Sequence, residues 1–388
     1  MQSIYRVFNS IDQVALDDWE HVRTACGSSS FMDPRFIAAV ESSMKQDCRF
    51  WYVIVYDKDR RPAACTCLCA MTIDVADLAN PRVASIIRRA SKLLSRLRFL
   101  KALICGLPGS PGEKSLALTS THAAPSILEQ LNQAISDLAA REGMDVIVYK
   151  EFGEDDLASM DGLLGLGYRR IPTQPMHFFR PSFPDFAHFC AALASRHRKN
   201  INRSIRKLEF AGVEIAVLAD PEDILRAYTP EVHALYYQMV AKAEVNMELL
   251  PIEFFRQLAS RLRGQVELVT LCKDSRIIAI GWCLHDRSAY HMLYAGLDYP
   301  LNADLDLYFN LMYATLDSAL RKGVSKIHVG QTAGAFKARL GCYSEPLYAF
   351  IKGQGPLMSW LVRRGAGLVL AEMPAVPPSD IFKKDGGD

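Results

Sequence analysis

The chain carries the same order of expected secondary structure twice, and this repeat limits the fold more than any other feature. Residues 51–69 and residues 266–284 each contain two apolar segments joined by a charged turn, the pattern of a β-hairpin. Each hairpin is followed by a helical segment that ends at a glycine, Gly143 or Gly323, and then by another apolar strand. This order predicts an α/β fold with mixed sheets covered by helices, present in two tandem copies.

The length of the chain also favours two domains, because 388 residues exceed what one ordinary hydrophobic core holds. Residues 171–184 are rich in proline and aromatic side chains, which predicts an extended crossing between the copies. We therefore expect a first domain over residues 1–176 and a second over 177–374. The polar end, residues 375–388, is expected to be a mobile tail.

The first copy is longer than the second, and the surplus lies near residues 80–112. This stretch holds a series of cations with no acid between them: Arg82, Arg88, Arg89, Lys92, Arg96, Arg98 and Lys101. Ile and Leu recur among them at helical spacing, which predicts a basic amphipathic helix added to the first domain. Such a helix contacts an anionic partner, which could be RNA, a carrier protein or a membrane surface. A solvated face over an ordinary apolar stripe gives the same pattern.

Composition narrows the class of protein. Half of the residues are hydrophobic and 23% are charged, as in globular proteins, and the formal net charge of +2 gives no overall nucleic-acid signature. The N-terminus lacks the apolar core of a signal peptide, and no apolar run is long enough to span a bilayer. The ten cysteines, with Cys65, Cys67 and Cys69 on one face of a predicted strand, lack zinc-site spacing. We expect a cytoplasmic protein without a metal.

A polar loop near the C-terminus is the strongest candidate for chemistry. It follows the predicted strand at residues 326–329, and a loop at the carboxyl end of a strand is a common place for functional side chains. Phe336, Lys337, Leu340 and Gly341 come next and place one cation among apolar neighbours. This segment resembles the closing motif of the acyltransferases with tandem GNAT folds. That group includes the Fem-type aminoacyltransferases of peptidoglycan synthesis and the BioF2-like acetyltransferases.

The resemblance implies two GNAT-like domains, with the active site near the second. In Fem-type enzymes a lysine in a Phe-Lys-x-x-Phe-Gly-like motif is thought to stabilise the oxyanion of acyl transfer, and Lys337 matches it. Leu340 stands where the motif has its second aromatic residue. A lysine whose aliphatic stem packs on a helix while its charge reaches solvent is the structural alternative.

The glycine-rich loop with which conventional GNAT enzymes hold the pyrophosphate of acetyl-CoA is missing. In the second copy the corresponding loop is predicted over residues 298–306, where carboxylates take the place of the glycines. The loop expected in the first copy, residues 121–126, also lacks the motif. This departure matches the Fem-type and BioF2-like branches.

Several other residues are candidates for the site. Asp306 could accept a proton and Asp304 could attract a substrate ammonium, although both would also suit a helix cap. Tyr294 could donate to a leaving group, or be a core aromatic. The catalytic candidates are thus Lys337, Asp306 and Tyr294. The substrate-binding candidates are Asp304, Tyr308, His328, Gln331 and Thr332.

A basic helix is predicted from Ser195, with apolar residues along one side. Four of its cations could hold a phosphate-bearing donor, or form a solvated face. They are Arg196, Arg198, Lys199 and Arg203.

These features lead us to expect an N-acyltransferase that moves an acyl group from an activated donor to a substrate amine. The donor would be acyl-CoA or a carrier-bound thioester, and the acceptor a small-molecule amine. The resemblance also allows an aminoacyl-tRNA donor, and a non-catalytic GNAT-like binding module is a further alternative. We expect no permanently bound cofactor and no covalent enzyme intermediate, and tRNA or an acyl carrier protein is a candidate partner.

Overall fold

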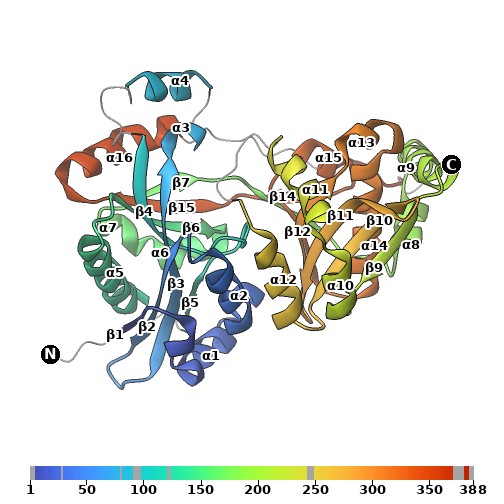
Figure 1. Cartoon of the computed structure of the whole chain (residues 1–388). Coiled ribbons are helices and arrows are strands. Elements are labelled where there is room, and N and C mark those ends of the chain that lie inside the picture. The colour runs from blue at the N-terminus through green and yellow to red at the C-terminus, as the bar shows by residue number, and fades with distance from the viewer. Residues whose placement is uncertain are drawn as a thin grey trace. The chain divides into compact units, whose positions relative to one another are not determined.

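The computed structural model describes residues 5–27, 29–78, 81–90, 98–119, 124–242, 249–369 and 380–383. The chain divides into two units, each built around one sheet (Figure 1). Unit 1 comprises Met1–Pro175, Val245–Phe254 and Pro346–Pro374, and unit 2 comprises Met176–Glu244, Phe255–Glu345 and Ala375–Asp388. No helix of the described residues is both long and apolar enough to cross a bilayer.

The sheet of unit 1 is antiparallel except for the pairing of β4 with β6, which is parallel. Its strands in spatial order are β1 (Tyr5–Phe8), β2 (Arg49–Tyr56), β3 (Pro62–Asp74), β4 (Phe99–Cys105), β6 (Val146–Phe152), β15 (Tyr348–Gly353) and β7 (Arg169–Pro172), with β5 (Leu116–Leu118) beside β3. Its helices are α1 (Leu16–Ala25), α2 (Pro34–Met44), α3 (Val75–Leu78), α4 (Pro81–Ala90), α5 (Ala124–Arg141), α6 (Glu154–Met160), α7 (Gly162–Gly165) and α16 (Gly355–Val369).

The sheet of unit 2 has the same plan, with one parallel pairing between β12 and β13. Its strands in spatial order are β14 (Tyr343–Glu345), β8 (Met176–Phe179), β13 (Lys326–Gly330), β12 (Ala289–Leu297), β11 (Arg276–His285), β10 (Val266–Lys273) and β9 (Glu214–Leu218). The helices are α8 (Phe186–Ala192), α9 (Ser195–Phe210), α10 (Pro221–Ala227), α11 (Pro230–Val240), α13 (Tyr299–Leu305), α14 (Leu307–Arg321) and α15 (Gly334–Arg339), while the residues of α12 (Ile252–Arg261) are divided between the units.

The two sheets exchange a strand. β7 and β8 follow each other in the chain, but β7 belongs to the sheet of unit 1 and β8 lies between β13 and β14 in unit 2. Likewise, β14 belongs to unit 2, and the next strand, β15, lies between β6 and β7 in unit 1. Each sheet therefore receives its penultimate strand from the other half of the sequence. The repeated order and the tandem α/β fold predicted from the sequence are confirmed.

Because of this exchange, one long segment belongs to a different unit than the sequence predicted. Pro346–Pro374 was expected within the second domain, but it groups with unit 1 because β15 forms ladders with both β6 and β7. The last described residues also differ from the expected mobile tail. Ile381 is buried, its carbonyl accepts a hydrogen bond from the Ala194 N–H at 2.9 Å, and Phe382 pairs with Leu193.

The basic addition to the first copy lies between β3 and β4, in a segment that contains α3 and α4. Its two ends are joined by Arg98, directly before β4, which donates two hydrogen bonds to the carboxylate of Asp74 at the end of β3, at 2.8 and 2.6 Å. Residues 82–90 lie on α4, as the sequence predicts, whereas Lys92 and Arg96 lie outside the described residues. The prediction is wrong for residues 99–105, because these form β4, a central strand between β3 and β6. Lys101 is therefore part of the sheet.

A buried carboxylate fixes α14 to the sheet of unit 2. Glu267 on β10 accepts hydrogen bonds from the Tyr290 hydroxyl at 2.9 Å and the Ser318 hydroxyl at 2.6 Å, and Lys322 Nζ lies 2.6 Å away. Burial raises the pKa of Glu267, but these donors outweigh it and hold the pKa below its usual value. The network joins β10, β12 and α14, the elements that lead into the site described below.

The strand exchange predicts a strong effect of Phe350 on the stability of unit 1. This residue of β15 is fully buried and contacts Phe152 of β6, with ring centroids 6.1 Å apart. Phe350→Ala is expected to lower the free energy of unfolding by roughly 3–5 kcal/mol, the range for a fully buried phenylalanine. Urea denaturation followed by circular dichroism measures the change.

The matched control is Phe210→Ala, because Phe210 is 90% exposed at the end of α9. This variant should unfold like the wild type. If Phe350→Ala and Phe210→Ala had similar small effects, the pairing of β15 within unit 1 would be contradicted.

Candidate functional site

The parallel strands of unit 2 separate before they end. β12 and β13 pair from Ala289 and Lys326 up to His291 and His328, after which β12 continues to Leu297 and β13 to Gly330. A shift in the pairing of β11 with β12 leaves Leu293 as an extra residue, since Trp282 pairs with Tyr294 and Cys283 with Met292. Such a β-bulge bends its strand and interrupts the ladder. The pairing thus stops before either strand ends, at the carboxyl ends of two parallel strands, a usual position for a ligand in α/β sheets.

The ammonium group of Lys337 lies beside the end of β13. A methyl group on Gly330 would lie 3.4 Å from Lys337 Nζ and 3.7 Å from the Met292 carbonyl oxygen, so the three groups are close neighbours. Gly330 has a φ of 88°, which favours glycine, and its missing side chain leaves room for the lysine. The turn Gln331–Ala333 and the short helix α15 that follow Gly330 carry Lys337 back to the end of β13.

The Lys337 side chain is buried without a counter-charge. It is 2% exposed, and no carboxylate in the described part of the chain forms an ion pair with it. Burial lowers the pKa of Lys337 to about 7, and Cys342 only partly opposes this. Burial also raises the pKa of the Cys342 thiol to about 12, so this neighbour is neutral. The folded protein therefore stabilises the charged form of Lys337 poorly.

His177 is a second residue at this position, and the sequence did not single it out. It lies on the exchanged strand β8, and its Nδ1 is 3.1 Å from the Gly330 carbonyl oxygen. Burial lowers the pKa of His177, and the charge of Lys337 lowers it further. A neutral His177 donates from Nδ1 to that carbonyl. No sequence signal marked His177, because its place depends on β8 pairing with β13 in a sheet formed mainly by the second copy.

Asp306 is held by other residues. It has left-handed backbone angles between α13 and α14, its Oδ1 lies 3.0 Å from Lys207 Nζ, and its Oδ2 accepts a hydrogen bond from the Ser204 hydroxyl at 2.6 Å. These contacts join the start of α14 to α9. Among the described residues, Asp306 forms neither a hydrogen bond nor an ion pair with Lys337. Asp304 is exposed on α13.

The remaining predicted residues have different neighbours. Tyr294 is half-buried on β12, beyond the point of separation, and contacts the rings of Tyr236 and Phe255. Tyr308 contacts the ring of Phe336, the residue before Lys337, with centroids 5.2 Å apart. Gln331 is half-buried and Thr332 is exposed.

His328 lies where the pairing of β12 with β13 ends. It is buried on β13, and its ring contacts those of His291 and Phe178, with centroids 4.1 and 4.8 Å away. Burial, followed by the nearby charge of Lys326, lowers the pKa of His328 to about 3. The imidazole is therefore neutral at physiological pH.

A cavity of about 200 Å³ lies between α9, α14 and α15. Four basic residues and one acid are among its lining residues: His197, Arg203, Lys207, Arg339 and Asp306. Phe336 and Arg339 belong to α15, the helix that holds Lys337. The cavity thus offers positive charge beside the helix of the candidate catalytic lysine.

Only part of the predicted phosphate-binding set lies at this cavity. Arg203 lines it, and Arg196 and Lys199 are exposed on the same helix. The three residues follow helical spacing, so they share one face of α9. Arg198 instead donates to the carbonyls of Ala191 and Leu193, at 3.5 Å each.

The segment expected to be a loop after β12 is mostly helical. Residues 299–305 form α13, and Asp298, directly before it, forms an ion pair with Arg276. The prediction of a loop over residues 298–306 is wrong, because α13 starts directly after β12. The counterpart in the first copy was placed at 121–126, and residues 121–123 of it lie outside the described residues.

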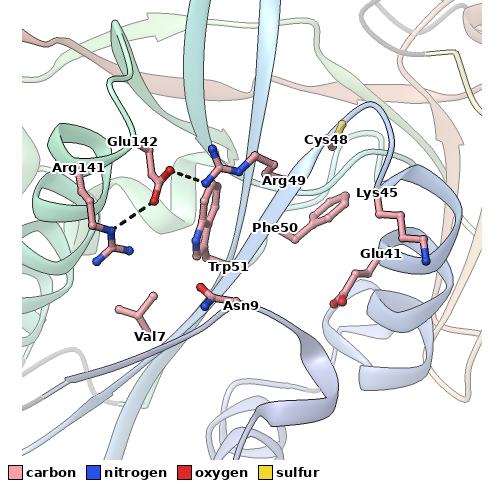
Figure 2. Close-up of a pocket in the computed structure, with 10 residues that line it drawn as sticks. All are labelled: Val7, Asn9, Glu41, Lys45, Cys48, Arg49, Phe50, Trp51, Arg141 and Glu142. Atoms are coloured by element: carbon pink, nitrogen blue, oxygen red, sulfur yellow. Dashed lines mark hydrogen bonds and ion pairs between the residues drawn. The ribbon is translucent and has the colours of Figure 1, made fainter.

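A larger cavity, of about 590 Å³, lies in unit 1 beside β1, β2 and the end of α5 (Figure 2). Figure 2 shows Glu142 between Arg49 and Arg141, with which it forms ion pairs. The Glu41 carboxylate accepts hydrogen bonds from the Tyr52 hydroxyl and the Ile11 N–H, at 2.8 Å each. Because these carboxylates are already engaged and both arginines are largely exposed, the cavity lacks the buried, unpaired charge found at Lys337.

Comparisons with known proteins place the chain in a family. A family model named FemAB-like and described as peptidoglycan biosynthesis/recognition matches residues 10–358. A search of curated proteins finds no significant match. Among solved structures, FemX aligns with a TM-score of 0.57 and 11% identity, over 89% of this chain and 98% of its own.

Two other structures are similar in the same way. The C-terminal domain of a putative lysylphosphatidylglycerol synthetase from Agrobacterium fabrum aligns with a TM-score of 0.51 and 12% identity, over 93% of this chain and 99% of its own. A tandem GNAT protein from the clavulanic acid biosynthesis pathway aligns with a TM-score of 0.50 and 10% identity, over 91% of this chain and 98% of its own. At these identities the structures show the fold alone.

The match over residues 10–358 takes in both units and the candidate site. It supports the expected enzyme class, a transferase of acyl or aminoacyl groups, at the level of the family. The chain belongs to the FemAB-like family and has its tandem GNAT fold.

Proposed function

We propose that the protein is an N-acyltransferase in which Lys337 stabilises the oxyanion formed when an amine attacks an activated acyl group. The observation that carries this proposal is the buried ammonium group of Lys337, without an ion-pair partner among the described residues, beside Gly330 where β12 and β13 no longer pair. Acyl transfer develops a negative charge on the carbonyl oxygen, and a fixed cation in a site with little water stabilises that charge.

The lowered pKa of Lys337 makes this role effective. In the free protein burial disfavours the ammonium form, whereas an oxyanion beside Nζ would favour it. The interaction is therefore stronger in the transition state than in the ground state, which is the condition for lowering the barrier. The hydrogen bond from His177 to the Gly330 carbonyl helps to hold the backbone against which Lys337 packs.

The proposed reaction forms a bond between the amine nitrogen and the carbonyl carbon, and breaks the bond between that carbon and the sulfur or oxygen of the donor. The amine loses one proton and the departing group gains one. Tyr294, on β12 beyond its separation from β13, is the candidate donor of the second proton. Asp306 is a weaker candidate for accepting the proton that the amine loses, because its carboxylate already binds Lys207 and Ser204.

The structure suggests how an anionic donor would be held. A helix N-terminus can hold a pyrophosphate through its free N–H groups, but α13 has the carboxylate of Asp298 directly before it and Pro300, which has no N–H, in its first turn. Basic side chains are available instead, on the exposed face of α9 and around the cavity beside α15. Either acyl-CoA or a carrier-bound thioester could use these charges.

The length of the basic face favours a second candidate donor, an aminoacyl-tRNA. Arg196, Lys199, Arg203 and Arg206 lie at helical spacing on α9 and are all exposed, so they could follow a phosphate backbone. Similarity to a putative synthetase of lysylphosphatidylglycerol, whose product carries an aminoacyl group, agrees with this candidate.

Replacement of Lys337 is expected to affect turnover far more than binding. Lys337→Met should lower kcat by roughly one hundredfold or more, the scale for losing one oxyanion donor, and change each KM much less. Steady-state assays with acetyl-CoA and with aminoacyl-tRNA as donors measure the effect. Lys273→Met, at the turn between β10 and β11, is the control and should behave as the wild type. Wild-type turnover by Lys337→Met would reject the assignment.

The same variant is expected to be more stable than the wild type at low pH. The pKa of Lys337 falls from 10.5 in the unfolded chain to about 7 in the folded protein, so the unfolded chain binds more protons between these values. Stability should therefore rise with pH across this window. At pH 6, Lys337→Met should gain on the order of 3–5 kcal/mol, from about 1.4 kcal/mol per pKa unit.

Denaturant melts at pH 6, 8 and 10.5 test this linkage. The gain should become small at pH 10.5, where Lys337 is neutral in the folded protein and only half protonated in the unfolded chain. Lys273→Met again provides the control. A loss of stability in Lys337→Met that is the same at every pH would show that the side chain acts only by packing.

The basic face of α9 is expected to bind the donor. Replacement of Arg196, Lys199 and Arg203 together by Ala should weaken tRNA binding and reduce the slope of log affinity against log salt by about one for each phosphate that is no longer neutralised. Arg261→Ala on α12 is the control.

Filter binding with tRNA and thermal shifts with CoA distinguish the two candidate donors. Stabilisation by CoA without tRNA binding identifies a thioester donor. Unchanged binding of both in the triple variant would contradict this role of α9.

A further inference from the structure

Helix α16 has apolar side chains on two faces, one packed and one exposed. Met358 and Val362 face the sheet of unit 1, where they pack against a core cluster that includes Ala102 and Ile171. Gly353 permits this packing, because a Cβ at that position would clash with the backbone of Met358.

The outer face of α16 carries a second apolar stripe. Leu357 and Trp360 are 66% and 50% exposed, and with Leu361 and Arg364 they follow the spacing of one helical face. The Arg364 guanidinium lies over the Trp360 ring, 5.8 Å from its centroid. An exposed tryptophan and leucine beside arginines need an explanation in a helix that is already packed on its other side.

Helix α4 continues this pattern. Its exposed face carries Arg82, Ile86 and Arg89 at helical spacing, and Ile86 is 65% exposed. Both α4 and α16 contact α3, and Figure 1 shows the three helices near one another at one end of unit 1. Neither α4 nor α16 contains an acidic residue, and Asp77 of α3 is paired with Arg88 at 3.0 Å.

We propose that this face of unit 1 docks on the surface of an anionic lipid bilayer. The docking face consists of Leu357, Trp360, Arg363 and Arg364 of α16 and Arg82, Ile86 and Arg89 of α4. Its positive charge is complementary to acidic lipid headgroups. Its aliphatic and indole side chains enter the boundary between headgroups and acyl chains, where amphipathic helices bind.

The apolar residues of the docking face favour a lipid surface over a nucleic acid as its partner. A nucleic-acid surface would match the arginines, but it would bring exposed Leu357 and Ile86 against phosphates and sugars, with no apolar phase to receive them. A bilayer matches both kinds of side chain. The proposed contact is peripheral, through the exposed side chains of α4 and α16.

The chain provides its own fluorescent reporter for this contact. Trp19, Trp51 and Trp282 are at most 4% exposed, so Trp360 is the tryptophan that a quencher or a lipid reaches first. The full-length protein is mixed with vesicles of phosphatidylcholine alone, or of phosphatidylcholine and phosphatidylglycerol at about 7:3. We expect co-sedimentation and a blue shift of emission with the anionic vesicles only, and quenching by lipids brominated on the acyl chains.

Variants separate the apolar and the charged contributions. The pair Arg363→Gln and Arg364→Gln should lower partitioning to anionic vesicles about tenfold or more, and the pair Arg82→Gln and Arg89→Gln should act similarly. Replacement of Leu357 and Trp360 by Ser should abolish sedimentation. Phe210→Ser, which removes an exposed ring from α9, is the control and should leave binding unchanged. Circular dichroism melts verify folding, and the arginine pairs, being exposed, keep the test valid if the serine variant unfolds.

Three results would overturn the proposal. These are no binding to anionic vesicles by the folded wild type, equal binding to both vesicle types, and vesicle binding that none of the docking-face variants reduces. Binding of an RNA oligonucleotide but not of vesicles, abolished in the same arginine variants, would assign the face to nucleic acid instead. None of these measurements depends on acyl transfer, so the docking face and the proposed activity of Lys337 stand or fall separately.

Discussion

The pairing of β8 with β13 and β14, and of β15 with β6 and β7, is the constraint on which the rest of the structure depends. Without these ladders each sheet would lack its penultimate strand and would expose the backbone groups of two others. The exchange also serves the site, because β8 brings His177 to the Gly330 carbonyl at the end of β13. Folding of the site in unit 2 therefore requires a segment that precedes the second copy in the sequence.

Desolvation of Lys337 links the fold to the chemistry. The separation of β12 from β13 and the absence of a side chain at Gly330 create the space that the lysine fills, and the surrounding apolar residues keep carboxylates away from it. A buried and unpaired cation costs folding energy. That cost is reasonable at a functional site, where a substrate supplies the missing negative charge only as the reaction proceeds.

Charge is distributed unevenly over the chain, although its net charge is only +2. The basic face of α9 and the cavity beside α15 lie in unit 2, with Lys337, and suit an anionic donor. The basic and apolar face of α4 and α16 lies in unit 1 and suits an anionic lipid surface. Two basic surfaces of different character are thus present: α9 exposes mainly cations, while α16 adds tryptophan and leucine.

The sequence by itself determined the local features. The charged turns and apolar alternation predicted both hairpins, the glycines after α5 and α14 marked the helix ends, and Phe336 and Lys337 marked the loop that carries the candidate catalytic lysine. These follow from turn chemistry and from the periodicity of side chains, which act between residues close in the chain.

Only the tertiary structure decided the long-range features. Strand exchange placed Pro346–Pro374 in unit 1, β4 took up residues expected in a helix, and Asp306 was engaged by Lys207 and Ser204. The burial of Lys337 without a counter-charge and the position of His177 likewise depend on strands far apart in sequence. Local propensity cannot specify such contacts, because a strand pairs as well with a distant partner as with a near one, and packing of the whole sheet makes the choice.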